Sequence, residues 1–235
     1  GNITFAFDHQ DRKGISDADR DYTKAKINGD YDTAQAYVDT DGWSIYGATI
    51  ASPDFGTTQA SALCDDLVSE YGSDTFRKVK ADTHWGTPGA EYCMYAYGNV
   101  SYNKASIDRN TMYVDSNYEV AEDVEWFGRA MVTQNKSFGR YAPPAAGWNK
   151  MAADNPHNPY DEETFGYFRW VGIGTRDGNV DDYNQDYLTG LRGTISAWDD
   201  ASWEFYYHYN QADNKSMGEY YLSYAGLAYN EKNGI

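Results

Sequence analysis

The chain is poor in basic residues, and this scarcity excludes one large class of partners. Lys and Arg together number 19 against 36 Asp and Glu, which gives the 235 residues a formal net charge of -17. A protein that binds nucleic acid neutralises phosphates with a surplus of positive side chains. We therefore expect no nucleic acid among the partners.

Long hydrophobic runs are also missing. The mean hydropathy is -0.78, and no apolar run approaches the roughly 18 residues that a membrane-spanning helix needs. These features do not exclude membrane crossing by strands. Aromatic residues make up 17% of the chain, with 23 Tyr, whereas disordered acidic chains contain few aromatics. The composition therefore predicts a folded chain. Residues 1–5 offer neither the basic region nor the apolar region of an export signal, so we expect no export signal in this chain.

Cysteine and histidine are scarce. Cys64 and Cys93 lie in a stretch rich in Gly, Asp and Ser, which favours a loop disulfide and an oxidising compartment. Two unrelated buried thiols are the alternative. No CxxC or HExxH motif occurs, so we expect no metal site and no cofactor. The four histidines are scattered: His9, His84, His157 and His208.

Two acidic segments have carboxylates at alternate positions, as calcium loops do. They are 17–21 and 177–182. Neither has the Gly at the sixth position or the Glu at the twelfth that an EF-hand requires. A solvated acidic turn is the preferred interpretation, and a looser calcium loop is the alternative.

Alternation of apolar and polar residues predicts five strands. The clearest are 183–197 and 202–211, which read as one hairpin of long strands. A second hairpin fits 107–120 and 124–135. The opening residues, 2–12, alternate in the same way.

The connections between these strands are very unequal in length. Links of about four residues join the hairpins, whereas 13–106, 136–182 and 212–235 are expected to be long loops rich in Gly, Pro, Asn and Asp. Short turns on one side and long loops on the other are typical of outer-membrane barrels. A soluble sandwich distributes its loop lengths more evenly.

Three tryptophans, Trp126, Trp198 and Trp203, flank the short turns. Aromatic residues at strand ends form the girdles of membrane barrels at the level of the lipid headgroups. The same residues would serve equally as the core of a β-sandwich. Periodicity alone does not separate the two interpretations.

Several motifs together resemble the barrel region of TonB-dependent outer-membrane receptors. They are 118–146, Asn155-Pro-His-Asn-Pro159, Gly174-Thr-Arg-Asp177, 186–193 followed by Trp198, and Gly1-Asn-Ile-Thr4 ahead of 17–22. Each match is loose, but their order and spacing follow the family and touch most of the chain. The resemblance implies a location in the bacterial outer membrane, in a barrel of about 22 strands closed by a plug domain. It also implies contact with outer-membrane lipid and the import of a small-molecule nutrient, driven by TonB.

The sequence lacks several features that the TonB-dependent receptor family has. It has no plug-like segment, no TonB box and no terminal strand ending in an aromatic residue. Five strands cannot close a membrane barrel, for which about eight is the practical minimum. We therefore expect an internal piece, all-β, forming an antiparallel transmembrane β-barrel segment with short periplasmic turns and long extracellular loops over 1–235. TonB would meet only the missing plug.

The best candidate for contact with a nutrient is the segment 137–148. It contains two prolines and carries Arg140, Tyr141 and Trp148, and aromatic faces with polar groups suit a sugar, siderophore or peptide. The alternative is that the prolines shape a loop whose aromatic residues pack within it.

Two other function classes remain as alternatives. A secreted soluble β-sandwich could bind carbohydrate through Tyr and Trp. A glycoside hydrolase needs only two carboxylates, but 36 acidic residues supply such a pair by number alone. No GxSxG, P-loop or GxGxxG motif is present, so we expect no catalytic residues.

Overall fold

The computed structural model describes residues 1–27, 40–54, 57–80, 90–156, 158–198 and 201–233. The fold is mostly antiparallel β-sheet, which confirms the predicted all-β class. The chain divides into two compact units. Unit 1 contains Gly1–Gly14, Ala105–Gly139 and Gly178–Met217, and unit 2 contains Ile15–Lys104, Arg140–Asp177 and Gly218–Ile235.

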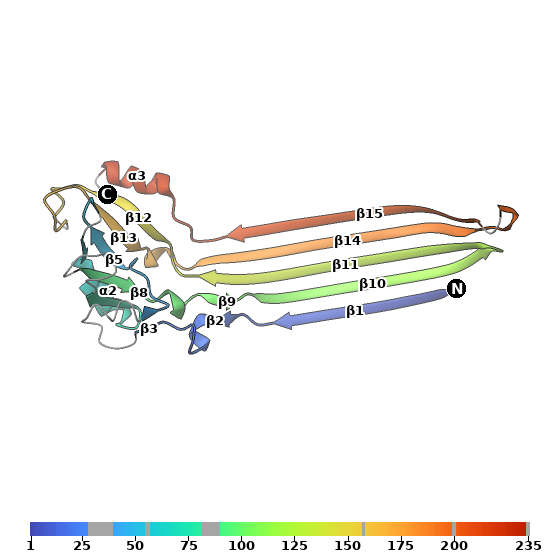
Figure 1. Ribbon diagram of the computed structural model, residues 1–235, viewed down its shortest axis with the longest axis horizontal. Helices are drawn as coiled ribbons and strands as arrows, with labels where there is room; N and C mark the ends of the chain where they lie inside the picture. The colour runs from blue at the N-terminus through green and yellow to red at the C-terminus, as the bar shows by residue number, and fades with distance from the viewer. Residues whose placement is uncertain (28–39, 55–56, 81–89, 157, 199–200, 234–235) are drawn as a thin grey trace. The chain divides into compact units, whose positions relative to one another are not determined.

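Unit 1 is a single five-stranded sheet in the order β1-β10-β11-β14-β15 (Figure 1). The strands are β1 (Asn2–Arg12), β10 (Ser106–Ala121), β11 (Val124–Tyr141), β14 (Arg176–Ile195) and β15 (Ala201–Gly218). Strand β1 has the expected bounds. Strands β11 and β15 extend beyond the predicted ranges 124–135 and 202–211, whereas β14 begins before the predicted range 183–197 and ends short of it, at Ile195. The added residues were missed because they alternate among mostly polar side chains, which show little contrast between the two faces.

Both hairpin connections of the sheet are short and lie at one end of it (Figure 1). Glu122 and Asp123 join β10 to β11, and Asp123 has a φ of 60°, a conformation that Asp tolerates better than most residues. Thr194 N donates to Asp123 O over 3.1 Å, so this turn is tied to the end of β14. The chain between β1 and β10, and between β11 and β14, leaves from the opposite end.

The strand register places large apolar side chains on one face of the sheet. Phe5 lies opposite Val114, which lies opposite Ala130 on the next strand. Farther across, Trp126 Nε1 donates to Thr189 Oγ1 over 2.9 Å, which puts Thr189 on the same face. We call this the apolar face. It carries Ile3, Phe5, Phe7, Met112, Val114, Tyr118, Trp126, Ala130, Val132, Tyr183, Tyr187, Leu191, Ile195, Trp203, Phe205, Tyr207 and Tyr209.

The opposite face, here the polar face, is dominated by hydrogen-bonding and charged side chains. Thr133 Oγ1 donates to Thr111 Oγ1, and Arg129 Nη2 lies 3.1 Å from Asp186 Oδ1. Larger side chains such as Tyr206 interrupt it. Its polar members include Thr4, Asp8, Gln10, Arg109, Thr111, Asp115, Asn117, Arg129, Thr133, Asn135, Asp182, Asp186, His208 and Asn210.

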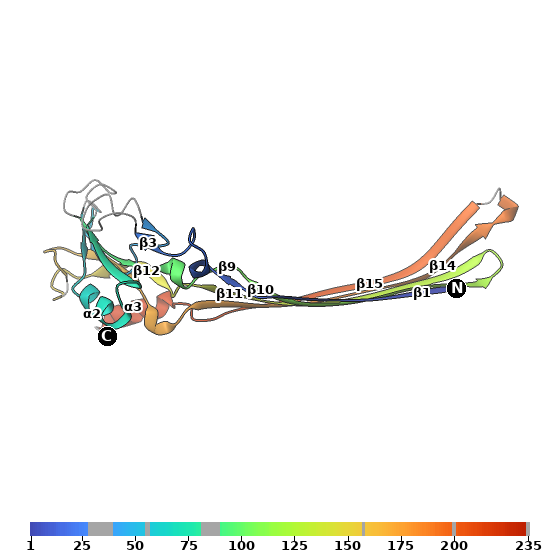
Figure 2. The same ribbon diagram turned by 90° about the horizontal axis from the view of Figure 1, so that it is seen from below.

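Unit 1 is one layer thick. Figure 2 shows its sheet edge-on as a single curved layer. Phe5 and Phe205, on the apolar face, are 62% and 73% exposed. Among the described residues, every buried hydrophobic side chain belongs to unit 2. The large apolar side chains of unit 1 are therefore not used to build an internal core.

Unit 2 is made of short elements. A four-stranded sheet has the order β12-β13-β5-β6, and β7 pairs with β8, β2 with β9, and β3 with β4. The strands are β2 (Ile15–Ser16), β3 (Lys26–Ile27), β4 (Thr40–Asp41), β5 (Ala48–Ala51), β6 (Thr58–Ala60), β7 (Phe76–Lys80), β8 (Glu91–Tyr95), β9 (Tyr102–Lys104), β12 (Ala145–Met151) and β13 (Thr164–Arg169). The α-helices are α2 (Leu63–Tyr71) and α3 (Tyr224–Asn233). Across the described residues, no helix has the length and apolar character needed to cross a membrane.

The core of unit 2 surrounds a disulfide. Cys64 on α2 and Cys93 on β8 are bonded, as predicted, and both are fully buried. The bond lies in a cluster with Phe76 and Tyr95, whose rings meet edge-on with centroids 5.1 Å apart. A covalent link between helix and hairpin restricts the unfolded chain and stabilises this small core.

The segments expected to be long loops, 13–106, 136–182 and 212–235, instead contain most of unit 2. The expectation missed this because strands of two to seven residues are too short to show a period. Strand β5 is buried at all four positions, so it also lacks the alternation of a half-buried strand.

Candidate functional site

Arg140 and Tyr141 end strand β11, and Trp148 lies in strand β12. The side chain of Trp148 lies outside the described residues. The structure brings Arg140 close to an acidic group and leaves Tyr141 61% exposed. Among the described side chains of the predicted contact residues, the aromatic ring of Tyr141 is therefore the one that is accessible to a ligand.

Arg140 is held by a bidentate pair with Asp177. Its Nε and Nη2 each lie 2.8 Å from a carboxylate oxygen of Asp177, and Thr175 Oγ1 donates to the same carboxylate over 3.0 Å. The hydrogen bonds from Arg140 hold the pKa of Asp177 below its ordinary value, and the pKa of Arg140 is raised in turn. Two parallel charge-assisted bonds fix a guanidinium firmly. Arg140 therefore orients the end of β11 more than it offers a charge to a ligand.

Tyr141 has a cationic neighbour. The guanidinium carbon of Arg176 lies 6.0 Å from the centre of the Tyr141 ring, and Arg176 Nε donates to Ala142 O over 2.9 Å. This distance is at the outer limit of a cation–π contact. An exposed phenol beside a guanidinium can stack on a sugar ring or donate hydrogen bonds to its hydroxyls.

The two prolines after Tyr141 are buried, and their carbonyl groups accept hydrogen bonds. Pro143 O accepts from Arg169 Nη1 over 2.8 Å, and Pro144 O accepts from Trp170 N over 2.9 Å. The prolines thus fix the path of the loop, which agrees with the structural alternative considered from the sequence.

Arg169 is a buried cation that sequence analysis did not single out. Its guanidinium donates to Tyr46 O, Pro143 O and Ser44 Oγ over 2.8–3.1 Å, and its carbon lies 4.7 Å from the centre of the Tyr95 ring. Burial lowers the pKa of Arg169 to about 10, which leaves it charged at neutral pH. The sequence signal that could have identified Arg169 is its position inside the aromatic run 164–170, where a charged residue is unexpected.

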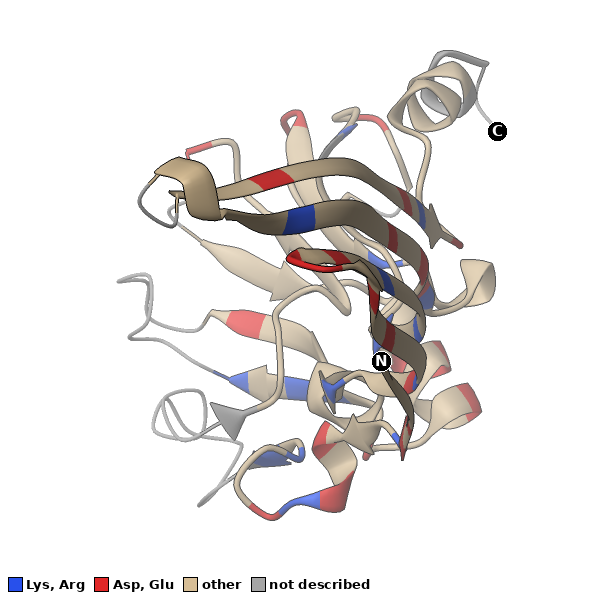
Figure 3. Ribbon diagram, turned by 90° about the vertical axis from the view of Figure 1, so that its right-hand side faces the viewer, with Lys and Arg blue, Asp and Glu red and all other residues tan. Residues whose placement is uncertain are grey.

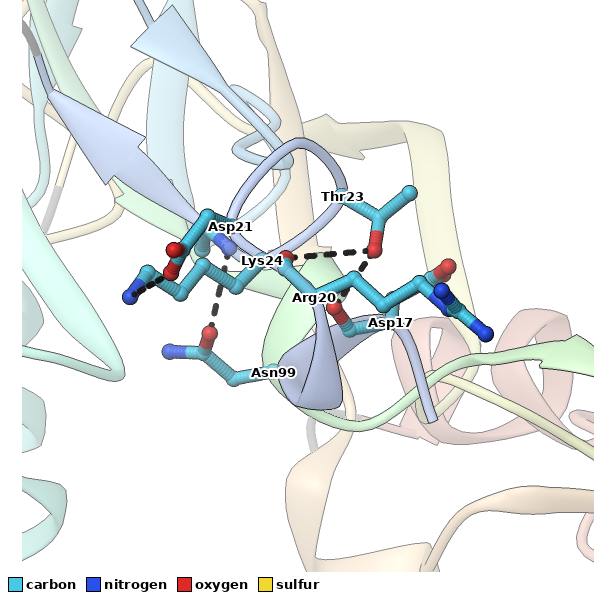
Figure 4. Close-up of polar contacts among 7 residues, drawn as sticks. Asp17, Arg20, Asp21, Thr23, Lys24 and Asn99 are labelled. Atoms are coloured by element: carbon cyan, nitrogen blue, oxygen red, sulfur yellow. Dashed lines mark hydrogen bonds and ion pairs between the residues drawn. The ribbon is translucent and has the colours of Figure 1, made fainter. Parts of the chain in front are cut away.

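The first acidic segment forms a turn held by hydrogen bonds and an ion pair (Figure 4). Asp19 accepts from Ser16 N, Asp21 pairs with Lys24 over 2.8 Å, and Thr23 Oγ1 donates to Asp17 O. The hydrogen bond from Lys24 lowers the pKa of Asp21. Over the described ranges, no three His, Cys, Asp or Glu residues gather as metal ligands would. This arrangement agrees with the solvated acidic turn.

His208 and His9 lie on opposite faces of the unit 1 sheet. His208 Nε2 lies 2.7 Å from Asp186 Oδ2 on the polar face, where Asn210 also donates to Asp186. His9 Nδ1 lies 2.8 Å from Asn110 Oδ1 on the apolar face. Both imidazoles are engaged in hydrogen bonds across strands. His157 and His84 lie outside the described residues.

The charged residues of unit 1 are spread along its strands (Figure 3). On the polar face, Arg129, Asp186 and His208 form one linked group. Arg192 Nε and Glu125 form a second pair over 2.7 Å. These groups join neighbouring strands and make the face hydrophilic without gathering into a site of one sign.

Comparison of this chain with protein-family models, with curated proteins and with solved structures finds no match.

Proposed function

We propose that this chain forms part of the barrel wall of an outer-membrane TonB-dependent transporter, with unit 2 among its nutrient-binding loops. The observation that carries the proposal is the uncovered apolar face. Burying one side chain such as Phe or Leu contributes about 1.5–3 kcal/mol, yet unit 1 covers none of these side chains with a core. A hydrocarbon solvent on that side removes the cost of exposing them to water.

The height of the apolar face suits a membrane. From Tyr183 to Ile195 the strand covers about 40 Å at about 3.3 Å per residue. A tilt of about 45° reduces this length to about 28 Å, close to the apolar band of about 25 Å in outer-membrane barrels. Trp126 and Trp203 lie near the short turns, and Tyr183 lies at the other limit of the span. Aromatic residues at both limits match the two girdles of such proteins.

The connections support the same proposal. Both short turns of the sheet leave from one end, and the segments of unit 2 leave from the other. Outer-membrane barrels place short turns on the periplasmic side and long segments outside. The disulfide Cys64–Cys93 agrees with this location, because disulfides form and persist in oxidising compartments outside the cytoplasm. Tyr141, on the same side as these segments, is the proposed contact for a sugar, siderophore or peptide.

The alternative, a secreted carbohydrate-binding β-sandwich, requires the apolar side chains of the strands to meet a second sheet. Phe5 and Tyr207 are 62% and 65% exposed, and Leu191 is 37% exposed. Unit 1 supplies no second sheet among its described strands. This observation favours the transporter over the sandwich.

Fractionation of the organism that makes the protein tests the proposal. We expect the native protein in the detergent-extracted outer-membrane fraction and absent from the soluble supernatant. A protein that remains soluble after ultracentrifugation, with no bound detergent or lipid, would contradict the transporter.

A further inference from the structure

Two exposed tyrosine rings of unit 2 are positioned by one short segment, 174–177. The centre of the Tyr141 ring lies 6.0 Å from the guanidinium carbon of Arg176. The ring of Tyr220 lies over Gly174, where a Cβ atom would be 3.4 Å from its Cγ and Cδ1. Each tyrosine is more than half exposed. The segment thus presents two aromatic rings to solvent.

The backbone holds Tyr220 in a fixed position. Its φ is 60°, a value that a bulky residue rarely adopts. Glu219 N donates to Asp177 O over 2.9 Å, which ties the preceding residue to the same segment. Because Gly174 has no side chain, the Tyr220 ring can pack directly on its backbone. A ring that is already in place loses little freedom when a ligand binds.

Arg176 adds a positive charge between these contacts. Its Nε donates to the carbonyl of the buried Ala142 over 2.9 Å, so its half-buried guanidinium is anchored at one edge. Within the described part of the chain, no carboxylate pairs with Arg176. The neighbouring Arg140 is instead occupied by Asp177. The two Nη groups of Arg176 are therefore the donors that an anionic ligand would meet.

A second tyrosine–arginine pair of unit 2 has the same geometry in different surroundings. The guanidinium carbon of Arg20 likewise lies 6.0 Å from the centre of the Tyr22 ring, which is also exposed. Arg20 belongs to the acidic segment 17–21, which contains three aspartates. Of the two pairs, the one at Tyr141 is thus the pair whose ring is combined with an uncompensated positive charge.

We propose that Tyr141, Arg176 and Tyr220 bind an acidic oligosaccharide. Its sugar rings stack on the two tyrosines, and a carboxylate accepts hydrogen bonds from the Nη groups of Arg176. Sugar rings pack well on aromatic faces, and the planar fork of a guanidinium matches a carboxylate. The inference rests on the proposed function, because it names the class of nutrient that the transporter takes.

The combination of rings and charge selects this class over two simpler ones. A neutral oligosaccharide leaves the charge of Arg176 unused, and a compact carboxylate such as citrate leaves both rings unused. The net charge of the chain is -17 and repels anions at a distance. Charges farther away than about 8 Å are largely screened at physiological salt, so the adjacent guanidinium decides the preference.

Calorimetric titration of the full chain in detergent at neutral pH tests the proposal with three probes. They are trigalacturonate, its neutral methyl ester, and citrate. We expect trigalacturonate to bind about tenfold more tightly than either other probe, because one charge-assisted bidentate contact or the ring contacts are then missing. Equal affinity for trigalacturonate and its ester, or citrate binding as tightly as trigalacturonate, would overturn the site.

Variants separate the charge from the rings. Arg176→Gln should remove the preference for trigalacturonate and leave the affinity for the ester unchanged, which also shows that the variant is folded. Tyr141→Ala should weaken both saccharides about fivefold, and so should Tyr220→Gly, in which glycine suits the positive φ. Arg20→Gln, in the matched pair, should change neither. Persistence of the preference in Arg176→Gln would overturn the role of this arginine.

Detergent bound to the same preparation, measured by analytical ultracentrifugation, separates this inference from the proposed function. A chain that binds detergent but shows no preference among the probes would overturn the acidic oligosaccharide and leave the transporter. A chain that prefers trigalacturonate yet stays monodisperse without detergent would overturn the transporter and leave the sugar site.

Discussion

His9 lies opposite Asn110 across the β1–β10 ladder, with Nδ1 2.8 Å from Oδ1, directly beyond the Phe7–Met112 pair on the same face. The change from apolar to polar side chains thus occurs at one level on adjacent strands. Such a level boundary is what a lipid–water interface imposes on a sheet. A soluble core would instead bury its apolar residues under a second layer.

Lysine on the two faces should have unequal effects. Val132 and Thr133 are neighbours on β11 and point to opposite faces. In lipid, Val132→Lys should cost about 2–4 kcal/mol because a charge enters hydrocarbon, whereas Thr133→Lys faces water and should cost less than about 1 kcal/mol. Unfolding in urea from phospholipid vesicles measures both. Equal effects of the two substitutions would count against a lipid-facing apolar face.

The disulfide should be resistant to alkylation and important for unit 2. Cys64 and Cys93 are fully buried and 29 residues apart. We expect no labelling by iodoacetamide before reduction under denaturing conditions, and Cys64→Ser/Cys93→Ser should lower stability by about 3 kcal/mol. Mass spectrometry and thermal unfolding check the two statements. Prompt labelling of the native protein would show free thiols.

The Arg140–Asp177 pair should make stability depend on pH. The pKa of Asp177 is lowered from 3.8 by the hydrogen bonds from Arg140, so the carboxylate stabilises the folded state above its unfolded pKa. This contribution is lost as pH falls below about 4 and through the folded pKa. Asp177→Asn should cost about 2 kcal/mol at pH 7.

Thermal unfolding of the wild type and Asp177→Asn at pH 7 and pH 3 measures this effect. The difference between the two proteins should shrink at the lower pH, because the wild-type carboxylate is becoming protonated. Asp161→Asn, in an exposed position of unit 2, is the matched control and should change little. A difference that is the same at both pH values would contradict the assignment.

Arg169 should be important for folding because its buried guanidinium ties together several segments of unit 2. It is 8% exposed and donates to three separate acceptors. Arg169→Gln leaves these acceptors unpaired and should lower stability by about 3 kcal/mol. Arg169→Lys keeps the charge but not the planar fork, and should recover only part of the loss. Full recovery by lysine, seen in thermal unfolding, would show that charge alone matters.

Unit 1 was largely predictable because its long strands show a clear period. Tyr183 to Ile195 alternates over enough residues to identify both faces. Unit 2 was not predictable in this way, since elements such as β13 pack most of their residues inside and give no period of two. The disulfide was accessible from cysteine count and context, but its position between α2 and β8 required the fold.

The candidate site was only partly accessible from sequence. Tyr141 could be proposed from its position beside prolines, and it is exposed. The partner of Arg140 is Asp177, 37 residues away, and no local pattern indicates that pairing. Arg169 escaped attention because its acceptors are backbone carbonyls and a serine, which leave no complementary charge in the sequence.

Site-directed labelling of one pair of adjacent residues tests the central claim most directly. Val114 and Asp115 are neighbours on β10 that lie on opposite faces of the sheet. A nitroxide is attached at Val114→Cys in the protein reconstituted in vesicles. Its spin relaxation should be accelerated by oxygen dissolved in the lipid and not by a water-soluble nickel chelate. The label at Asp115→Cys should show the reverse preference. Equal access of the nickel chelate to both labels would contradict a sheet with one face in hydrocarbon and the other in water.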